Sequence, residues 1–453
     1  MQPLPKEFEE QMKRLLGEAG FFAYLDALNQ PYARALRVNL LLRPDGTPSC
    51  PIEGLGAPVP WAKGAYFVEG DARPGLSPLH EGGLFYMQEP SALTAVTALD
   101  PQPGERVLDL CAAPGGKSTQ IAALMAGRGL LCCNEPIPSR AQILSRNIER
   151  MGVRNAVVLS AMPDALAPRF PAFFDRILVD APCSGEGMFR RQPEARDEWD
   201  ADAPRRCADR QIEILTQAAK MLRPGGTMVY STCTFNDTEN EGVLKRFLAL
   251  HPEFSLVPFA LPGLPEAKDG YLHLYPHEMR GEGHFVSRLK KADGADGADA
   301  PVQAAPQRKA PARAAAKGKA PAPIALPDVF SDAFAPERLY TAGDALWMLP
   351  EGISIERLSG LRVLRTGLLL AHAEGKRSEP DHALAMALRP EEAARTASLT
   401  QTQALAYQAG ETLSLGDLPG GYTLLCCEGV SLGWGKQAGG LMKNHYPKGL
   451  RRR

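Results

Sequence analysis

The feature that most constrains the fold is a regular alternation of short apolar runs and helical segments between residues 76 and 290. This alternation is typical of a parallel α/β sheet, in which a helix connects each strand to the next. The expected strands cover residues 106–110, 130–134, 156–160, 176–180 and 227–231. Because ligands of such sheets bind in the crevice at the carboxyl ends of the strands, we expect the chemistry to lie there.

Composition divides the rest of the chain into three parts. Residues 1–75 combine an amphipathic helix with a strand-like run at 36–42, which predicts a small α+β domain. Residues 291–327 are mostly Ala, Pro, Lys and Gly, and this composition offers too little apolar surface to offset the entropy of ordering, so we expect a disordered linker. Residues 328–453 regain strand and helix patterns, which predicts a separate small domain.

Composition also excludes several classes of protein. The 453 residues contain no apolar stretch that could span a bilayer, and the first residues lack the apolar segment of a signal peptide, so we expect a cytoplasmic protein. In that compartment the nine cysteines are expected to be thiols. The absence of a Cys-x-x-Cys motif and of ligand-like histidine spacing argues against a bound metal. Since the sequence contains no coiled-coil pattern, we expect a monomer.

The distribution of charge favours a nucleic-acid partner, although the net charge is −1. Lys and Arg residues are concentrated at 308–319 and again at 443–453, and neither segment contains an acidic residue. Local basic patches matter more than total charge for contacts with phosphates. The alternative is a solvated linker for the first group and a frayed terminus for the second.

Two cysteines lie in dense motifs fifty residues apart, each after an expected strand. Cys183 follows the strand that ends at Asp180 and lies in Ala-Pro-Cys-Ser-Gly, whereas Cys233 lies in Ser-Thr-Cys-Thr. Because the carboxyl ends of parallel strands share one edge of a sheet, both thiols are expected in one crevice. This arrangement suggests covalent catalysis. The alternative is a pair of buried structural thiols, as we expect for Cys132 and Cys133.

The loop at 111–119 reads Cys-Ala-Ala-Pro-Gly-Gly-Lys-Ser-Thr and joins a strand to a helix, as ligand-binding loops do. A nucleoside triphosphate is disfavoured because Cys111 replaces the first glycine of the P-loop pattern. A dinucleotide is disfavoured because G-x-G-x-x-G is absent. S-adenosylmethionine needs an acid at the end of the next strand for its ribose hydroxyls, and Glu135 occupies that position. The alternative for Glu135 alone is a surface acid at a strand end.

These motifs together resemble the Nol/Nop/Sun family of RNA cytosine-C5 methyltransferases, and most closely its bacterial RsmF-like branch, whose members modify 16S ribosomal RNA. The segments that carry the resemblance are 36–39, 88–92, 111–119, 180–189 and 433–449. The resemblance implies a Rossmann-like, S-adenosylmethionine-dependent methyltransferase core at 76–290. It further implies that an N-terminal α+β domain and a C-terminal PUA-like domain bind RNA. The implied partner is 16S rRNA of the small ribosomal subunit.

The resemblance also implies which residues bind S-adenosylmethionine. They are Cys111, Ala112, Ala113, Pro114, Gly115, Gly116, Lys117, Glu135, Arg140 and Asp180. Family members often carry an Asp facing the adenine after the third strand. In this chain Met162 falls nearest that position and Asp164 comes two residues later. We therefore expect backbone groups and packing against Met162 to hold the adenine.

Cytosine C5 becomes nucleophilic when a thiolate adds to C6, and a second group must later remove the C5 proton. By the resemblance, Cys233 is the nucleophile, Cys183 assists release, and Asp180 binds the N3–N4 edge of the base, donating to N3 if it is protonated. The alternative exchanges the two cysteines, because DNA cytosine-C5 methyltransferases attack with a Pro-Cys motif.

The function that follows is methylation of cytosine C5 in 16S rRNA. The base must be single-stranded or leave its stack to reach the crevice, and Phe189, Arg190 and Arg191 are expected to line the mouth. The sequence separates rRNA poorly from tRNA or DNA as the substrate. A non-catalytic RNA-binding ribosome assembly factor is the alternative from another class.

Overall fold

The structure is a computed structural model, and it describes residues 4–294, 324, 328–329, 336–374 and 377–452. Most of the expected linker, including the basic group at 308–319, lies outside the described residues. The first linker position, Lys291, is the buried last residue of a strand, so ordered structure continues at least that far.

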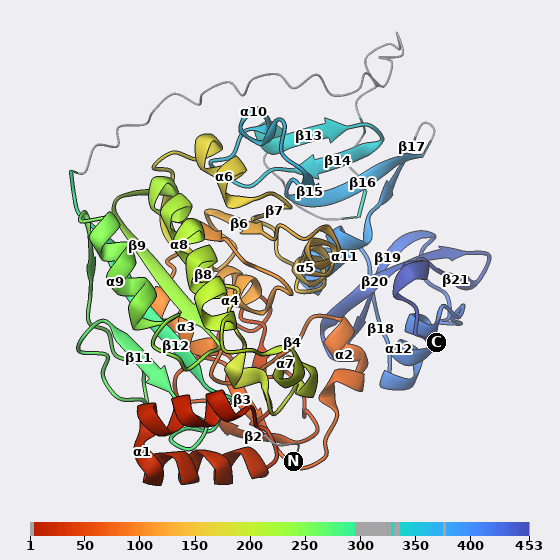
Figure 1. Ribbon diagram of the computed structural model, residues 1–453. Coiled ribbons are helices and arrows are strands. Elements are labelled where there is room, and N and C mark those ends of the chain that lie inside the picture. Colours follow the sequence, from red (N-terminus) through yellow and green to blue (C-terminus); the bar gives the residue numbers. More distant parts are fainter. Residues whose placement is uncertain (1–3, 295–323, 325–327, 330–335, 375–376, 453) are drawn as a thin grey trace.

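Within the described residues, a nine-stranded sheet forms the centre of the molecule (Figure 1). Its order is β10-β12-β9-β8-β5-β6-β7-β15, with β11 beside β12. The strands are β5 (Arg106–Asp109), β6 (Leu130–Asn134), β7 (Ala156–Leu159), β8 (Phe174–Asp180), β9 (Leu222–Thr232), β10 (Phe254–Leu256), β11 (Tyr271–Leu274), β12 (His284–Lys291) and β15 (Val363–Arg365). The five expected strands are β5 to β9, and they pair in parallel, whereas the other strands are antiparallel.

Helices cover both faces of this sheet because alternate side chains of a strand point to opposite sides. Leu108 and Cys132 belong to the core under α8 and α9, whereas Val107 and Cys133 belong to the core under α3, α4 and α5. Both of these cysteines are buried free thiols, as expected. The helices of this region are α3 (Leu93–Leu99), α4 (Gly116–Leu124), α5 (Pro138–Arg150), α6 (Pro163–Leu166), α7 (Pro193–Glu198), α8 (Ala203–Met221) and α9 (Glu241–Leu250), with short 3-10 turns at Ala167–Arg169 and Glu186–Met188.

The N-terminal unit is a helical segment and a four-stranded sheet of order β2-β3-β1-β4. Its elements are α1 (Lys6–Asn29), β1 (Ala35–Val38), β2 (Leu55–Pro58), β3 (Ala65–Val68), a 3-10 turn (Pro74–Leu76), α2 (Pro78–Glu81) and β4 (Phe85–Gln88). Because β4 pairs with β1, this unit extends past residue 75, where we expected it to end. The strand expected at 36–42 stops at Val38, since the N–H groups of Leu42 and Arg43 bond to the Asn39 carbonyl and turn the chain.

The C-terminal region contains two sheets, of order β13-β14-β16-β17 and β18-β19-β20-β21. Its elements are β13 (Leu339–Ala342), β14 (Ala345–Met348), α10 (Ile355–Leu358), β16 (Leu368–Glu374), β17 (Arg377–Pro380), α11 (His382–Ala387), β18 (Thr396–Ser398), α12 (Gln401–Ala409), β19 (Gly421–Cys427), β20 (Val430–Ala438) and β21 (Leu441–Asn444), with 3-10 turns at Pro336–Arg338, Pro390–Glu392 and Lys448–Leu450. No described helix has the length and hydropathy needed to cross a bilayer.

The region 328–453 is not a separate body, in contrast to the expectation. β15 adds to the edge of the central sheet beside β7, and Leu425 and Val430 share one apolar core with Phe85 of the N-terminal unit. The basic terminus also docks, because the Arg452 guanidinium donates to the carbonyls of Leu76 and Ser77 at 2.5 and 2.9 Å. Three sequence regions therefore stabilise one another.

Candidate active site

The carboxyl ends of β8 and β9 bring the two motif cysteines together. Cys183 Sγ lies 3.2 Å from Cys233 Sγ, and both are free thiols. The hydrogen bond to Cys233, together with burial, raises the pKa of the Cys183 thiol well above its usual range. Cys183 is therefore the thiol that stays protonated, and it can donate a hydrogen bond to the sulfur of Cys233.

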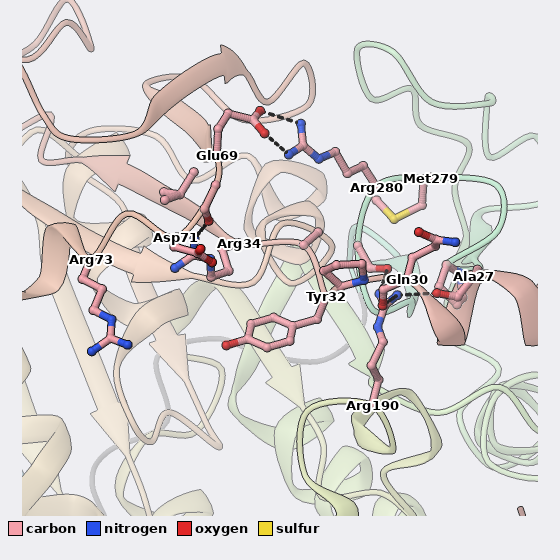
Figure 2. A pocket seen from close by; sticks show the side chains of 16 residues that line it. Ala27, Gln30, Tyr32, Arg34, Glu69, Asp71, Arg73, Arg190, Met279 and Arg280 are labelled. Carbon is pink, nitrogen blue, oxygen red and sulfur yellow. Dashed lines mark hydrogen bonds and ion pairs between the residues drawn. The ribbon is translucent and has the colours of Figure 1, made fainter. Parts of the chain in front are cut away.

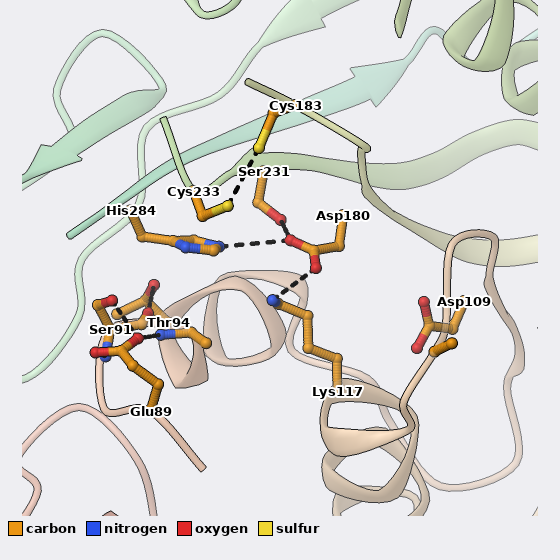
Figure 3. A network of polar contacts seen from close by, with 12 residues as sticks. Glu89, Ser91, Thr94, Asp109, Lys117, Asp180, Cys183, Ser231, Cys233 and His284 are labelled. Atoms are coloured by element: carbon orange, nitrogen blue, oxygen red, sulfur yellow. Dashed lines mark hydrogen bonds and ion pairs between the residues drawn. The ribbon is translucent and has the colours of Figure 1, made fainter. Parts of the chain in front are cut away.

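Asp180 ends β8 and lies at the centre of a polar network (Figure 3). Its carboxylate accepts from Lys117 Nζ at 2.8 Å and from Ser231 Oγ at 2.7 Å. Burial by itself would raise the pKa of Asp180, but Lys117 and His284 lower that pKa well below its ordinary value. Asp180 is thus ionised and can accept a hydrogen bond from an amino group, so the protonated form considered from the sequence is disfavoured.

His284 completes this network and was missed by the sequence analysis. Its Nε2 lies 3.5 Å from Asp180 Oδ1, at the outer limit of a hydrogen bond, and its side chain is 4% exposed. Burial and the nearby Lys117 ammonium lower the pKa of His284, so it is neutral. No local motif marks this residue. It reaches Asp180 because β12 runs antiparallel beside β9, which itself lies beside β8.

A buried carboxylate holds the turn that carries Cys183. Glu239 accepts from the Ser184 N–H at 3.0 Å and from the amides of Gln211 and Asn236, both at 2.8 Å. Burial raises the pKa of Glu239. The sequence analysis did not identify this residue, because two of its partners, Ser184 and Gln211, are distant in sequence.

A second set of contacts holds the turn against the loop after β9. Glu186 accepts from the backbone N–H groups of Phe235 and Asn236 at 2.8 and 3.0 Å. The Gly187 N–H donates to the Cys233 carbonyl at 2.8 Å. A Cβ at Gly187 would lie 2.9 Å from that same carbonyl oxygen, so this close approach requires glycine. The relative position of the two thiols is therefore fixed by the backbone.

The expected cofactor residues gather at the ends of β5 and β6. Glu135 is 2% exposed, and its carboxylate accepts from the Ile137 N–H at 3.0 Å. Arg140 lies 3.4 Å from Glu135 and also donates to the Ala113 carbonyl at 3.3 Å, so it links the acid to the loop. α4 starts at Gly116 within this loop, and its first N–H groups have no carbonyl partners within the helix.

Asp109, the last residue of β5, was also missed. It is fully buried, and its Oδ2 accepts from Ser118 Oγ at 2.6 Å, whereas its Oδ1 has no partner among the described residues. Burial raises the pKa of Asp109 to about 7. An orphaned carboxylate oxygen beside the loop fits a ligand with a cationic amino group, such as S-adenosylmethionine. Its place at a strand end, directly before the loop, is the signal that could have identified it.

The residues expected at the adenine and at the mouth of the site differ in how exposed they are. Met162 is 61% exposed and Asp164 is exposed, so the contact with adenine stays a prediction. Phe189 does not line a mouth: it is 1% exposed and packs edge-on against Phe8 at 5.0 Å between ring centroids. Arg190 forms an ion pair with the buried Glu282.

Comparison with protein families gives matches along most of the chain. The matching family models are the N-terminal domain of 16S rRNA methyltransferase RsmF at residues 4–90, 16S rRNA methyltransferase RsmB/F at 96–290, the RsmF rRNA methyltransferase first C-terminal domain at 327–388, and the methyltransferase RsmF PUA domain at 394–452. The two C-terminal matches correspond to the two C-terminal sheets. The N-terminal match, at 4–90, includes β4 and so agrees with the extent of the N-terminal unit.

Individual proteins agree with these matches. The ribosomal RNA small subunit methyltransferase F of Erwinia tasmaniensis is 34% identical, and the alignment covers 98% of this chain and 96% of that protein. The protein of the same name from Klebsiella pneumoniae is 34% identical with the same coverage.

Solved structures share the central fold. The crystal structure of a methyltransferase homolog protein from Pyrococcus horikoshii is 30% identical, with a TM-score of 0.54 over 63% of this chain and 95% of that chain. NSun6 from the same organism matches in fold, at 23% identity and a TM-score of 0.55, over 64% of this chain and 98% of that one. The Rossmann-like core and the PUA-like region are thereby confirmed. The chain belongs to the RsmB/F family of 16S rRNA methyltransferases, in its RsmF branch.

Proposed function

We propose that the protein methylates C5 of a cytosine in 16S rRNA, with S-adenosylmethionine as the methyl donor and a transient covalent bond between Cys233 and C6 of the base. The observation that carries this proposal is the pair of thiols 3.2 Å apart beside the ionised Asp180. A pure structural role would not require two thiols at the edge of the sheet where ligands bind. An rRNA substrate would place the protein in the bacterial cytoplasm.

The residues suggest how attack is prepared. Cys183 keeps its proton and donates toward Cys233, which favours Cys233 as the thiolate that adds to C6. As the Cys233–C6 bond forms, the C5–C6 π electrons move to C5. The Asp180 carboxylate accepts a hydrogen bond from the N4 amino group and so holds the base in register. Lys117, whose pKa is raised by Asp180 against the effect of burial, stays charged beside it.

The donor bound at the loop would supply an electrophilic methyl group, which C5 attacks. Glu135 and the loop at 111–117 would hold that molecule, and Asp109 Oδ1 would accept from its amino group. Release then requires that solvent water or hydroxide take the C5 proton, that the electrons of the C5–H bond re-form the C5–C6 double bond, and that Cys233 depart as a thiolate. We assign Cys183 to this last step, because it is the titratable side chain that touches the departing sulfur.

The test is a trapping experiment on the full chain. Wild type, Cys183→Ala and Cys233→Ala are incubated with small ribosomal subunits and S-adenosylmethionine and then run on denaturing gels. We expect a covalent protein–RNA band for Cys183→Ala, 5-methylcytosine in RNA treated with wild type, and neither product with Cys233→Ala. Cys50→Ala is the matched control, because this thiol is partly exposed and distant in sequence from both motifs.

Other results would change the proposal in defined ways. A band that forms with Cys233→Ala instead would exchange the roles of the two thiols. Methylation of tRNA, or of naked 16S rRNA but not of subunits, would keep the chemistry and change the substrate. If wild type binds RNA but transfers no methyl group, the alternative of a non-catalytic assembly factor would replace the proposal.

A further inference from the structure

A cavity of about 790 Å³ lies between the N-terminal unit and the segment that leads into β12 (Figure 2). Its walls are residues 27–34 at the end of α1, residues 68–73 after β3, residues 276–281, and Arg190. Its volume is in the range of cavities that hold a small molecule or one unit of a polymer, roughly 300–1,000 Å³. The methylation chemistry does not use this cavity.

Part of the cavity wall, Arg190 and residues 276–281, belongs to segments that continue to groups of the candidate active site. Arg190 forms a bidentate ion pair with Glu282, at 2.7 and 2.9 Å. It comes seven residues after Cys183. The Glu282 N–H donates to Glu89 at 2.8 Å, and the chain continues within two residues to His284 of the Asp180 network. A ligand in this cavity would therefore touch segments that continue within a few residues to Cys183 and to His284.

The arginine side chains that line the cavity differ in whether they already have a partner within the protein. Arg190 is tied to Glu282, and Arg280 forms a two-pronged pair with Glu69 at 2.9 and 2.8 Å. Arg73 is exposed, and its side chain has no hydrogen bond or ion pair within the described part of the chain. Arg34 donates to the carbonyls of Ala72 and Gly70. Arg73 is therefore the lining cation that can contact an anionic group without breaking a hydrogen bond or ion pair among the described residues, and the exposed Asp71 is the lining acid that such a group must avoid.

An aromatic side chain lines the same cavity as this cation. Tyr32 is 45% exposed, and in Figure 2 its ring projects between Arg73 and Arg190. The guanidinium of Arg191 lies 5.5 Å from the centroid of the Tyr32 ring. Exposed aromatic rings and guanidinium planes are the surfaces on which unpaired bases of RNA stack, while arginines contact the phosphates. This combination favours a nucleotide over an apolar ligand.

We propose that the cavity binds a nucleotide that flanks the target cytosine in a single-stranded RNA segment. Tyr32 stacks on its base and Arg73 contacts its phosphate. This inference rests on the proposed RNA methyltransferase function and adds a substrate-positioning subsite to it. Binding there would fix the strand while the neighbouring base enters the crevice between Asp180 and Cys233.

The test uses full-length variants and two independent readouts. Binding of a fluorescein-labelled single-stranded RNA is measured by anisotropy at several salt concentrations, and methyl transfer to small ribosomal subunits is measured at saturating S-adenosylmethionine. We expect Tyr32→Ala to raise Kd and the KM for RNA roughly tenfold with kcat little changed, and Tyr32→Phe to behave as wild type. Arg73→Ala should reduce the slope of log K against log salt by about 0.7. Affinity for S-adenosylmethionine, measured by calorimetry, should stay unchanged in both variants.

Arg14→Ala is the matched control, because Arg14 is an exposed cation on α1 outside the cavity. Equal losses in Arg14→Ala and Arg73→Ala would indicate a diffuse basic surface and overturn the subsite. Wild-type Kd and KM in Tyr32→Ala would overturn it as well. A wild-type protein that binds RNA without transferring methyl groups would refute the proposed function, whereas the anisotropy data would still decide whether the cavity binds RNA.

Discussion

The two halves of the catalytic crevice are built in different ways. At the ends of β8 and β9, the charge of Asp180 is paired with Lys117, and Glu239 is surrounded by three donors. At the ends of β5 and β6, Asp109 keeps a buried carboxylate oxygen with no partner among the described residues, and Met162 is 61% exposed.

This difference indicates which half of the crevice has its side chains oriented by the protein before any ligand binds. Groups that act on a reacting base are most effective when their orientation is fixed before the substrate arrives, and the β8–β9 half has that property. A buried polar atom without a partner is costly, so the β5–β6 half is the one that a ligand completes. The predictions below test this contrast.

The largest effect is expected from breaking the ion pair in the preorganised half. Lys117→Met leaves Asp180 as a buried charge without its cation, so we expect methyl transfer to be lost and the free energy of unfolding to fall by about 2–3 kcal/mol, less than for a fully buried pair. The discount reflects the 28% exposure of the Asp180 side chain. Denaturant unfolding and transfer of tritiated methyl groups measure the two effects.

The double variant Lys117→Met/Asp180→Asn is the control for that experiment. Removing both charges should restore most of the stability but none of the activity, because the unpaired charge is gone while the base-binding carboxylate is also absent. A single variant as stable as wild type would contradict the assignment of this pair.

The next effect concerns Asp109 and depends on pH. Its pKa rises from 3.8 in the unfolded chain to about 7 in the folded protein, so the folded state holds the proton more tightly. Its contribution to stability is therefore present below about pH 4 and is lost as pH rises through about 7, by an amount on the order of a few kcal/mol. Asp109→Asn should remove this loss, so its melting temperature should exceed that of wild type at pH 8 and approach it at pH 4.

The same variant should bind S-adenosylmethionine more weakly, because an amide oxygen attracts a cationic amino group less than a carboxylate does. Calorimetry at pH 8 measures this affinity, with Ser118→Ala as a control that removes the partner of the other carboxylate oxygen. If the melting temperatures of Asp109→Asn and wild type differed by the same amount at every pH between 4 and 8, a raised pKa of the buried Asp109 would be contradicted.

A smaller effect is expected from Glu239. Glu239→Ala leaves the Ser184 N–H without an acceptor and removes one hydrogen bond from each of the Gln211 and Asn236 amides, so we expect a loss of about 2 kcal/mol in unfolding free energy and slower methyl transfer. Glu239→Gln retains one acceptor oxygen and should lose less of both. If Glu239→Ala instead kept full activity, the turn that carries Cys183 would be held by other contacts.

The smallest effect is expected from Met162. Because its side chain is mostly exposed, Met162→Ala should change the free energy of unfolding by less than about 0.5 kcal/mol. A modest loss of affinity for S-adenosylmethionine, without a change in stability, would support packing of Met162 on the adenine. Unchanged affinity would leave backbone groups as the adenine contacts.

Local sequence was sufficient to predict the central strands and the motifs at their ends. The strands β5 to β8 lie within two residues of the expected bounds, because a continuous buried apolar run is a strong local signal, whereas β9 begins five residues before its expected start at 227. Asp180 ends β8, and the loop at 111–117, Glu135 and both motif cysteines begin within three residues of a strand end. Parallel pairing then places them along one edge of the sheet, so their proximity could be inferred before the structure.

Only the tertiary structure decided which partners tune these groups. His284 reaches Asp180 through antiparallel pairing of β12, and Glu239 accepts from Ser184 and Gln211, which are distant in sequence, so the local sequence identified neither residue. The merging of residues 328–453 with the core likewise depends on β15 and on an apolar cluster shared with β4. Sequence patterns report local backbone preference and the periodicity of burial, whereas pKa values, ion pairs and shared cores depend on contacts between distant segments.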